Sequence, residues 1–523
     1  MAAPVFLRLF PLIALVVIAT PGTAQARGQA ETSLATNQAS PNGDWTAACH
    51  VLQHTDFSAI PDAPTHVARA EVVTASKGQP TYCRVDGFID PQIGIEMRLP
   101  VTSWNGKFME KGCGGWCGAI TDFDWMCPEA LRSGYACITT DMGHKGSSGE
   151  DISWARNNLQ AQIDFGYRAT HAVAVAGKVI AARFYGKQPS RSYYYGCSTG
   201  GYQGVMEAQR FPWDFDGIVA GAPDIDETQA NFRGLWLAKV ELDGAGRPIL
   251  GRDQLNLLHD AALALCDMDD GVKDGVISNP VGCRFKPESL RCKVAQSSGC
   301  LTDAQVYVAR KIYSGPVDSS GRPTSTGSFL IGSELEWGNL WPTQSLVDYF
   351  RYGMEGYSTK PDFKDSDFDF NQDYKRFGLA PQYDNSNPDL RRLQLAGTKL
   401  IVFHGTTDTT DPPGPVIDYY RMVERVMGGR KNTQSFFRLF LLPGMNHCWG
   451  GAGVMQVDWI RMLEDWVELG KAPEGVIAAH PADSKGPRFT RPLYPFPDYA
   501  KYKGKGDVNE AQNFARVPGA SSP

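Results

Sequence analysis

The stretch SYYYGCSTG, residues 192–200, joins a run of strand-forming tyrosines to a glycine-rich turn that opens a helix. Its last five residues have the pattern G-x-S-x-G, which at a strand-to-helix turn exposes the central serine as a nucleophile. Glycines two positions before and after Ser198 leave room for strained backbone dihedrals, and the N-terminus of the following helix favours developing negative charge. Ser198 is therefore the candidate nucleophile, although a helix N-cap serine in a glycine-rich turn would give the same pentapeptide.

Strand-like and helical segments alternate on both sides of this turn. We expect strands at Tyr135–Thr140, Ser192–Tyr195, Phe215–Ala220, Lys399–Phe403 and Phe437–Leu442, and helices at Tyr167–Tyr185 and Tyr419–Met427. Such alternation indicates an α/β fold built on a parallel sheet with helices on both faces.

The alternation is interrupted between Asp224 and about Leu395. This part is rich in Gly, Pro, Asp and aromatic residues and has only scattered helical stretches, among them Gln254–Leu265 and Asp303–Tyr313. Because the strand pattern resumes afterwards, we predict one α/β catalytic domain made of residues 27–223 and 396–480, with a lid domain inserted at 224–395. The polar tail, residues 481–523, is expected to wrap the surface.

The first 26 residues have the pattern of a signal peptide. Arg8 precedes an apolar run, Leu9–Ala19, and the segment ends in Ala24-Gln25-Ala26, the small-x-small pattern before a cleavage site. A membrane anchor is the alternative, but the apolar run is shorter than the ~20 residues that a spanning helix needs. Twelve cysteines, an even number, fit an oxidising compartment in which they pair. We therefore expect a secreted or periplasmic protein with no membrane span.

The overall composition is that of an ordinary globular protein. The 523 residues are 42% hydrophobic and 21% charged, and the formal net charge is −6. No run of Lys and Arg stands out, so a nucleic-acid partner has no electrostatic basis.

A serine nucleophile needs a base, and the base needs an orienting carboxylate. In the chain order of α/β-hydrolases, Ser…Asp/Glu…His, both partners lie on loops after later strands. Asp408 and His447 each follow one of the last two predicted strands, whereas the rival carboxylate Asp411 lies further from its strand end. The sequence thus predicts an α/β-hydrolase fold with a large inserted lid domain and the catalytic triad Ser198, Asp408 and His447.

Two cysteines flank members of this triad. Cys197 directly precedes the nucleophile and Cys448 directly follows the base, so a productive Ser–His contact brings their sulfurs within bridging reach. A disulfide between them would hold the triad together. In the loop-entropy model it would also restrict the unfolded chain by roughly 5 kcal/mol.

These residues resemble a known arrangement. Cys197-Ser198, Asp408 and His447-Cys448 are similar to the Cys-Ser, Asp, His-Cys set of the tannase and feruloyl esterase family, which includes the mono(2-hydroxyethyl) terephthalate hydrolases. The resemblance extends over most of the mature chain and includes residues 104–108, 134–136, 141–144, 443–448 and 502–509. It implies a serine carboxylic ester hydrolase that cleaves small-molecule esters of aromatic acids, of feruloyl or galloyl (tannin) type, through an acyl-enzyme and without an organic cofactor. A mono(2-hydroxyethyl) terephthalate hydrolase-like esterase, a non-catalytic binding protein on the same fold and a peptidase of that fold are the alternatives.

The resemblance also implies a structural calcium ion in the lid. The segment CDMDDGVKDGVI, residues 266–277, concentrates oxygen donors at short spacing, although it does not match the EF-hand pattern. A solvated acidic turn is the alternative. The family's ligands correspond here to the side chains of Asp267, Asp270 and Asp274 and the carbonyls of Val272 and Val276.

The remaining cysteines divide into two groups. The chain departs from the family at Tyr494 and Arg516, where the family commonly has a pair of cysteines. It also has four cysteines around the glycine-rich loop 112–118, where the family usually has none, and four cysteines allow three connectivities. By analogy with the family we expect the disulfides Cys49–Cys83, Cys266–Cys283 and Cys292–Cys300, and we leave open the pairing of Cys113, Cys117, Cys127 and Cys137.

An oxyanion hole needs two backbone N–H donors. The first is the N–H of Thr199, directly after the nucleophile, and the second comes from the earlier glycine-rich loop, from Cys113 or Gly114. Trp116 of the same loop either contacts the substrate or belongs to the core.

Overall fold

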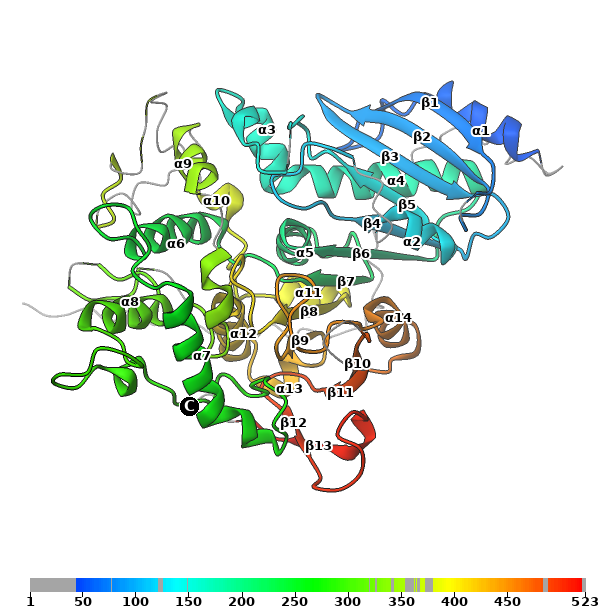
Figure 1. Ribbon diagram of the computed structural model, residues 1–523. Helices are drawn as coiled ribbons and strands as arrows, with labels where there is room; N and C mark the ends of the chain where they lie inside the picture. Colours follow the sequence, from blue (N-terminus) through cyan, green and yellow to red (C-terminus); the bar gives the residue numbers. More distant parts are fainter. Residues whose placement is uncertain are drawn as a thin grey trace, which may run out of the picture. The chain divides into compact units, whose positions relative to one another are not determined.

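A nine-stranded sheet runs through the part of the chain that the computed structural model describes (Figure 1). Its strands are ordered β1-β2-β3-β5-β4-β6-β7-β8-β9. The strands are β1 (Thr65–Val73), β2 (Tyr82–Ile89), β3 (Ile93–Pro100), β4 (Lys107–Lys111), β5 (Ala136–Thr140), β6 (Arg191–Cys197), β7 (Gly217–Gly221), β8 (Lys399–Gly405) and β9 (Phe437–Leu442).

The structure describes residues 44–519 except 77, 121–125, 148, 319, 325–326, 340–342, 353–361, 363, 365–366, 372–379 and 483–487. The predicted signal peptide, residues 1–26, lies outside the described residues. Within the described part no helix is both long and apolar enough to cross a bilayer.

The five predicted strands and the parallel arrangement hold for one part of the sheet. From β5 through β4 to β9 all neighbouring strands are parallel, and β8 pairs Leu400 with Phe437 of β9. The prediction of a wholly parallel sheet was wrong for the other part, because β1, β2, β3 and β5 pair antiparallel. Strands β1, β2 and β3 carry charged residues among the apolar ones, so they lack the continuous apolar run of a strand that is buried on both faces.

The parallel strands are covered on both faces because successive side chains point to opposite sides of a sheet. Ile218 and Ala220 of β7 belong to one hydrophobic cluster, whereas Val219 between them belongs to a second. In β8, Val402 joins the first cluster and Phe403 joins the second. The core therefore lies in two layers, one on each side of the sheet.

Helices from different parts of the chain cover these layers. Ala- and Val-rich α4 contributes to the first cluster, and α14 contributes to the second through Trp459, Leu463 and Trp466. Gly186, in the left-handed conformation with φ 69°, ends α4. The helices are α1 (Trp45–Gln53), α2 (Cys127–Arg132), α3 (Leu159–Ile163), α4 (Ala169–Tyr185), α5 (Thr199–Arg210), α6 (Glu227–Val240), α7 (Arg252–Cys266), α8 (Asp303–Ser314), α9 (Thr343–Arg351), α10 (Ala380–Tyr383), α11 (Arg391–Ala396), α12 (Pro413–Val426), α13 (Arg430–Thr433) and α14 (Trp459–Leu469).

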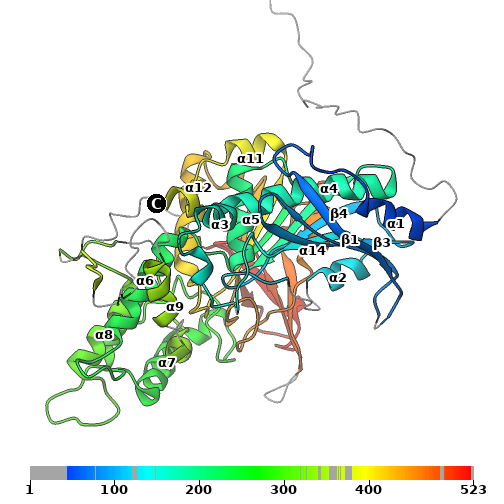
Figure 2. The same cartoon turned by 90° about the horizontal axis from the view of Figure 1, so that it is seen from above.

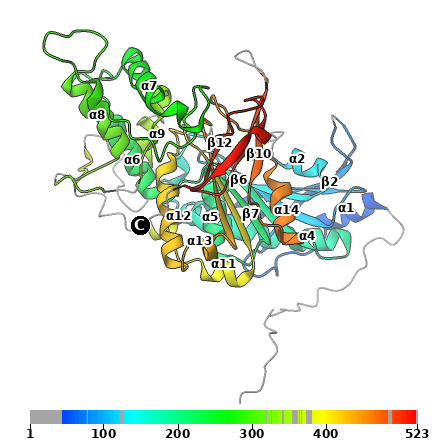
Figure 3. The same cartoon turned by 90° about the horizontal axis from the view of Figure 1, so that it is seen from below.

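The segment between β7 and β8 has a hydrophobic cluster of its own. Trp236 of α6, Leu258 of α7 and Ala309 of α8 pack in it together with Trp337. Helices α6, α7 and α8 lie together in all three views (Figure 1, Figure 2 and Figure 3). The role of this segment as a lid, with the boundaries 224–395, stays a prediction.

The tail after α14 forms two small antiparallel sheets. Strand β10 (Val476–His480) pairs with β11 (Phe489–Leu493), and β12 (Tyr499–Tyr502) pairs with β13 (Phe514–Val517). The backbone N–H of Phe496 donates to the carbonyl of Leu439 at 2.7 Å, which joins the tail to β9.

Candidate active site

Ser198 lies at the sharp turn between β6 and α5. Its backbone is strained, with φ 62° and ψ −127°, and its N–H donates to the carbonyl of Gly221 at 3.0 Å. A Cβ at Gly196 would lie 2.5 Å from the carbonyl oxygen of Gly200, so the turn needs glycine there. Among the described residues the Ser198 side chain forms no capping hydrogen bond with α5. The geometry is that of a nucleophile elbow rather than of an N-cap serine.

Asp408 and His447 lie together at the ends of β8 and β9. His447 Nδ1 is 2.9 Å from Asp408 Oδ2 and 3.9 Å from Asp411 Oδ2. Asp408 is fully buried and accepts hydrogen bonds at 3.0 Å from the backbone N–H groups of Thr410 and Asp411. His404 Nε2 lies 3.3 Å from the same carboxylate. The hydrogen-bonding partner of His447 is therefore Asp408, and Asp411 is a more distant neighbour.

The charges of this group shift its pKa values in opposite directions. Burial alone would raise the pKa of Asp408, but His447 and His404 lower it below the ordinary range. Burial would lower the pKa of His447, but the negative charges of Asp408, Asp411 and Asp224 raise it to about 9. The imidazole thus favours its protonated form more than an ordinary histidine does.

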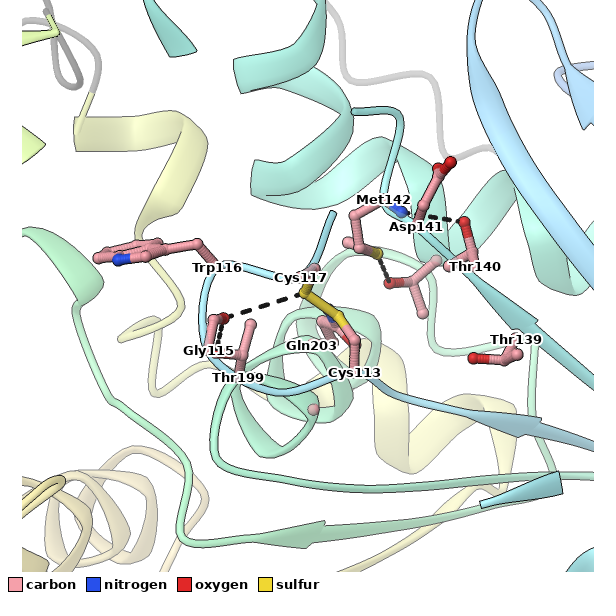
Figure 4. The surroundings of a disulfide bond; sticks show 12 residues. Cys113, Gly115, Trp116, Cys117, Thr139, Thr140, Asp141, Met142, Thr199 and Gln203 are labelled. Carbon is pink, nitrogen blue, oxygen red and sulfur yellow. Dashed lines mark hydrogen bonds between the residues drawn. A yellow bond between two sulfur atoms is a disulfide. The ribbon is translucent and has the colours of Figure 1, made fainter. Parts of the chain in front are cut away.

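The loop after β4 lies against the N-terminus of α5 (Figure 4). The hydroxyl of Thr199 donates to the carbonyl of Gly115 at 2.5 Å, and Gln203 Nε2 donates to Cys113 Sγ at 3.0 Å. A disulfide between Cys113 and Cys117 closes the loop. These contacts place the loop beside the nucleophile, where an oxyanion hole requires it.

Trp116 of this loop belongs to the core, and its contact with a substrate stays a prediction. Its ring packs 5.8 Å from Phe165 and 5.6 Å from Tyr349 between centroids, and it is almost fully buried. Figure 4 shows it turned away from the disulfide. It also lines the pocket that contains Ser198.

The pocket at Ser198 has about 70 Å³ of space. Of the expected oxyanion residues, Thr199 lines it, whereas Gly115 and Trp116 line it in place of Cys113 and Gly114. Gly115 was not named as an oxyanion donor from the sequence. The other residues that line the pocket are Asp224, Glu227, Ala230, Asn231, Gly234, Leu346, Thr410 and Asp411.

Three of these lining residues are acidic, and the sequence analysis gave none of them a role in the pocket. The carboxyl groups of Asp224 and Asp411 lie close enough for each to shift the pKa of the other. Burial and the neighbouring carboxylate raise the pKa of Asp224 well above its ordinary range, and burial raises that of Asp411 to about 6. Arg233 Nη2 lies 3.6 Å from Asp224 Oδ1.

Comparison with known proteins identifies the family. A family model for tannase and feruloyl esterase matches residues 77–517. The chain belongs to the tannase and feruloyl esterase family. This membership makes it a carboxylic ester hydrolase and confirms the predicted family and α/β-hydrolase fold.

Individual relatives cover nearly the whole chain. A mono(2-hydroxyethyl) terephthalate hydrolase of Piscinibacter sakaiensis is 32% identical over 90% of this chain and 91% of its own. A probable feruloyl esterase of Arthroderma benhamiae is 34% identical over 82% of this chain and 83% of its own. The crystal structure of feruloyl esterase B from Aspergillus oryzae superimposes with a TM-score of 0.78 at 27% identity, covering 90% of this chain and 100% of that one.

All twelve cysteines lie within the described residues, and all are paired. Cys197 and Cys448 are joined, with their Cα atoms 6.0 Å apart, next to Ser198 and His447. The pairs are Cys49–Cys83, Cys113–Cys117, Cys127–Cys137, Cys197–Cys448, Cys266–Cys283 and Cys292–Cys300. They include the four pairs expected from the sequence, and the four cysteines left open pair as near neighbours in the chain.

The acidic side chains of the segment after α7 are engaged by groups of the protein itself. In the described residues no group of three or more His, Cys, Asp or Glu side chains is arranged to hold a metal ion. Asp270 accepts hydrogen bonds from the N–H of Val272 at 2.8 Å and the hydroxyl of Ser278 at 2.6 Å, and Asp274 pairs with Arg491 at 2.6 Å. The family's calcium ion is therefore not supported by the arrangement of these side chains.

Proposed function

We propose that this enzyme cleaves esters of aromatic acids, of feruloyl or galloyl type, through an acyl-enzyme formed on Ser198. The observation that carries the proposal is the meeting of three elements at one edge of the sheet. The strained turn at Ser198 and the hydrogen-bonded pair of Asp408 and His447 are joined through the Cys197–Cys448 disulfide.

Each member of the triad has one task in this reaction. Ser198 Oγ attacks the ester carbonyl carbon while His447 accepts its proton, and the buried Asp408 holds the imidazole and stabilises its charge. The C–O bond to the alcohol then breaks, and His447 donates the proton to the departing oxygen. Water repeats the sequence on the acyl-enzyme, releasing the acid and restoring Ser198.

The negative oxygen of the tetrahedral intermediate needs backbone donors. We assign the N–H of Thr199 at the start of α5 and one N–H of the loop 113–115 to this role. Support comes from the Thr199–Gly115 hydrogen bond, which fixes the loop beside the nucleophile.

An aromatic acyl group suits the pocket because Trp116, Ala230 and Leu346 give it apolar walls. Mono(2-hydroxyethyl) terephthalate is the alternative substrate, favoured by the 32% identity to the hydrolase of Piscinibacter sakaiensis. The specificity constants kcat/KM for methyl ferulate, methyl gallate and mono(2-hydroxyethyl) terephthalate rank these candidates.

The decisive variant is Ser198→Ala, which should lower turnover of every ester by several orders of magnitude while the protein stays folded. Ser190→Ala is the matched control, since this exposed serine precedes the opposite end of β6 and its hydroxyl donates to the carbonyl of Gly106 at 3.0 Å. A binding protein on the same fold would show no Ser198-dependent turnover. A peptidase would cleave the amide that matches the preferred ester, and activity of Ser198→Ala within tenfold of wild type would contradict the triad.

Export is a separate proposal, based on the pattern of residues 1–26 and on the six disulfides, which are typical of an oxidising compartment. The N-terminal sequence of the protein recovered outside the cytoplasm should begin after Ala26. Protein recovered from the periplasm or medium with residues 1–26 intact would contradict cleavage there.

Calcium binding at residues 267–276 is also kept as a proposal. Its support is electrostatic: Asp267 and Asp270 are buried, and the charge of Asp274 contributes to raising the pKa of both. A divalent cation would remove this repulsion. A chelator should then lower the melting temperature, and an unchanged melting curve with no metal in the purified protein would exclude the site.

A further inference from the structure

The pocket at Ser198 combines an apolar part with an acidic part. The apolar part is formed by Trp116, Ala230 and Leu346. The acidic part is formed by Asp224, Asp411 and Glu227. None of the lining residues that the structure describes is a Lys, Arg or His. An aromatic acyl group in this pocket therefore meets oxygen acceptors and no cationic side chain on the pocket surface.

The two aspartates lie next to each other on the pocket surface. Their carboxyl groups are close enough for each to shift the pKa of the other, and Asp411 is buried. Nη2 of the buried Arg233 lies 3.6 Å from Asp224 Oδ1, and Arg233 is not one of the described residues that line the pocket. The backbone of Asp411 is held by its N–H bond to Asp408 and by His404 Nε2, 2.6 Å from its carbonyl oxygen.

Glu227 extends the acidic surface from the first turn of α6. Its side chain accepts a hydrogen bond at 2.9 Å from Asn231 Nδ2, one turn further along the helix. The Asn231 amide therefore donates to Glu227, and the carboxyl oxygens on this side of the pocket can accept hydrogen bonds from a substrate.

Such a surface distinguishes substrates by the group on their ring. A hydroxyl can donate to a carboxylate, whereas a methoxy group can only accept and does not supply that donor. A ring carboxylate would bring a further negative charge into a pocket that already contains acidic side chains, where like charges are poorly screened. Sites built to bind a hydroxyl reject analogues that lack it much more strongly than apolar pockets do.

We propose that Asp224 and Asp411 are specificity-determining residues that select aromatic esters with a hydrogen-bond-donating hydroxyl on the acyl ring and reject esters with a carboxylate there. The inference rests on the proposed ester hydrolysis at Ser198. It narrows the substrate class of that function, because it predicts a higher kcat/KM for esters of phenolic acids than for monoesters of terephthalic acid.

Three methyl esters that differ only in the para group test the proposal: methyl 4-hydroxybenzoate, methyl 4-methoxybenzoate and monomethyl terephthalate. Each kcat/KM is measured at pH 7, where the phenol is neutral and the ring carboxyl is ionised. The electronic effect of a substituent on its ester is the same for every form of the enzyme, so it cancels when the ratios of wild type and variants are compared. For the wild type we expect the hydroxyl ester to exceed the methoxy ester by about tenfold and the carboxylate ester by at least 100-fold.

The variants Asp224→Asn and Asp411→Asn should each reduce the hydroxyl-to-carboxylate ratio by at least tenfold, because each removes an acid from the pair. Asp253→Asn, an exposed carboxylate in the first turn of α7, removes the same charge elsewhere and should leave the ratio unchanged. Melting curves establish that the variants are folded.

Wild-type ratios within threefold of unity would overturn the proposal without any variant, and so would folded Asn variants that keep the wild-type ratio. These outcomes differ from failure of the proposed function, in which none of the three esters shows turnover that depends on Ser198.

Discussion

The acidic neighbours of His447 should determine the pH at which the enzyme works. A general base must be neutral, and the pKa of His447 is raised to about 9 by Asp408, Asp411 and Asp224 against the opposite effect of burial. Activity should therefore rise with pH through the range around 9. Removing a neighbouring negative charge destabilises the imidazolium, so Asp411→Asn should move this rise to lower pH.

The magnitude follows from the geometry. Asp411 Oδ2 lies 3.9 Å from His447 Nδ1, and two unit charges at about 4 Å interact by about 4 kcal/mol at an effective dielectric constant of 20. The actual effect is smaller, because the His447 side chain is 26% exposed and solvent screens the interaction. We expect a downward shift of about one pKa unit, equivalent to about 1.4 kcal/mol.

The assay is the pH profile of kcat/KM with methyl 4-methoxybenzoate. This ester lacks a ring hydroxyl, so the loss of a hydroxyl contact in Asp411→Asn does not affect its profile. Each profile is divided by its own plateau, and at pH 7 the relative activity of Asp411→Asn should be about tenfold that of the wild type. Asp253→Asn is the control for a general change in charge. A rising limb that stays in place, or moves to higher pH, in Asp411→Asn would refute the electrostatic reasoning.

Three further variants test the parts of the site separately. Asp408→Asn should lower kcat by about 10⁴-fold with little change in KM, because the imidazole is held in the wrong tautomer, and a loss below tenfold would contradict its role. Replacing Cys197 and Cys448 by Ala should lower both the melting temperature and turnover. Their sequence separation of 251 corresponds to a stabilisation of roughly 5 kcal/mol in the loop-entropy model. Free thiols at both positions, found by alkylation without reduction, would contradict the disulfide. Replacing Cys113 and Cys117 by Ala should lower the free energy of unfolding by about 2 kcal/mol at most, because their sequence separation is only 4. The same change should lower kcat more than it raises KM, since the loop lies beside the nucleophile. An unchanged kcat would show that the loop needs no disulfide.

The parallel part of the fold could be predicted because burial on both faces leaves a local signal. Each strand from β6 to β9 contains at least four consecutive apolar residues or glycines, and each is followed by a turn. The antiparallel strands β1 to β3 leave no such signal. Their charges pair across strands, as Arg84 does with Glu96 and Arg69 does with Asp86, and these pairs become visible only when the register is known.

The acidic pair was missed for a reason that lies in the sheet order. The carboxyl ends of neighbouring parallel strands meet at one edge of a sheet, and β6, β7, β8 and β9 are neighbours in that order. Ser198 follows β6, Asp408 follows β8 and His447 follows β9, so whatever follows β7 must lie between the nucleophile and the Asp–His pair. The residue in that position is Asp224, which in the sequence marks only the start of the predicted insertion. A residue that follows the strand between two catalytic strands lies in the site because of the topology, whether or not a motif indicates it.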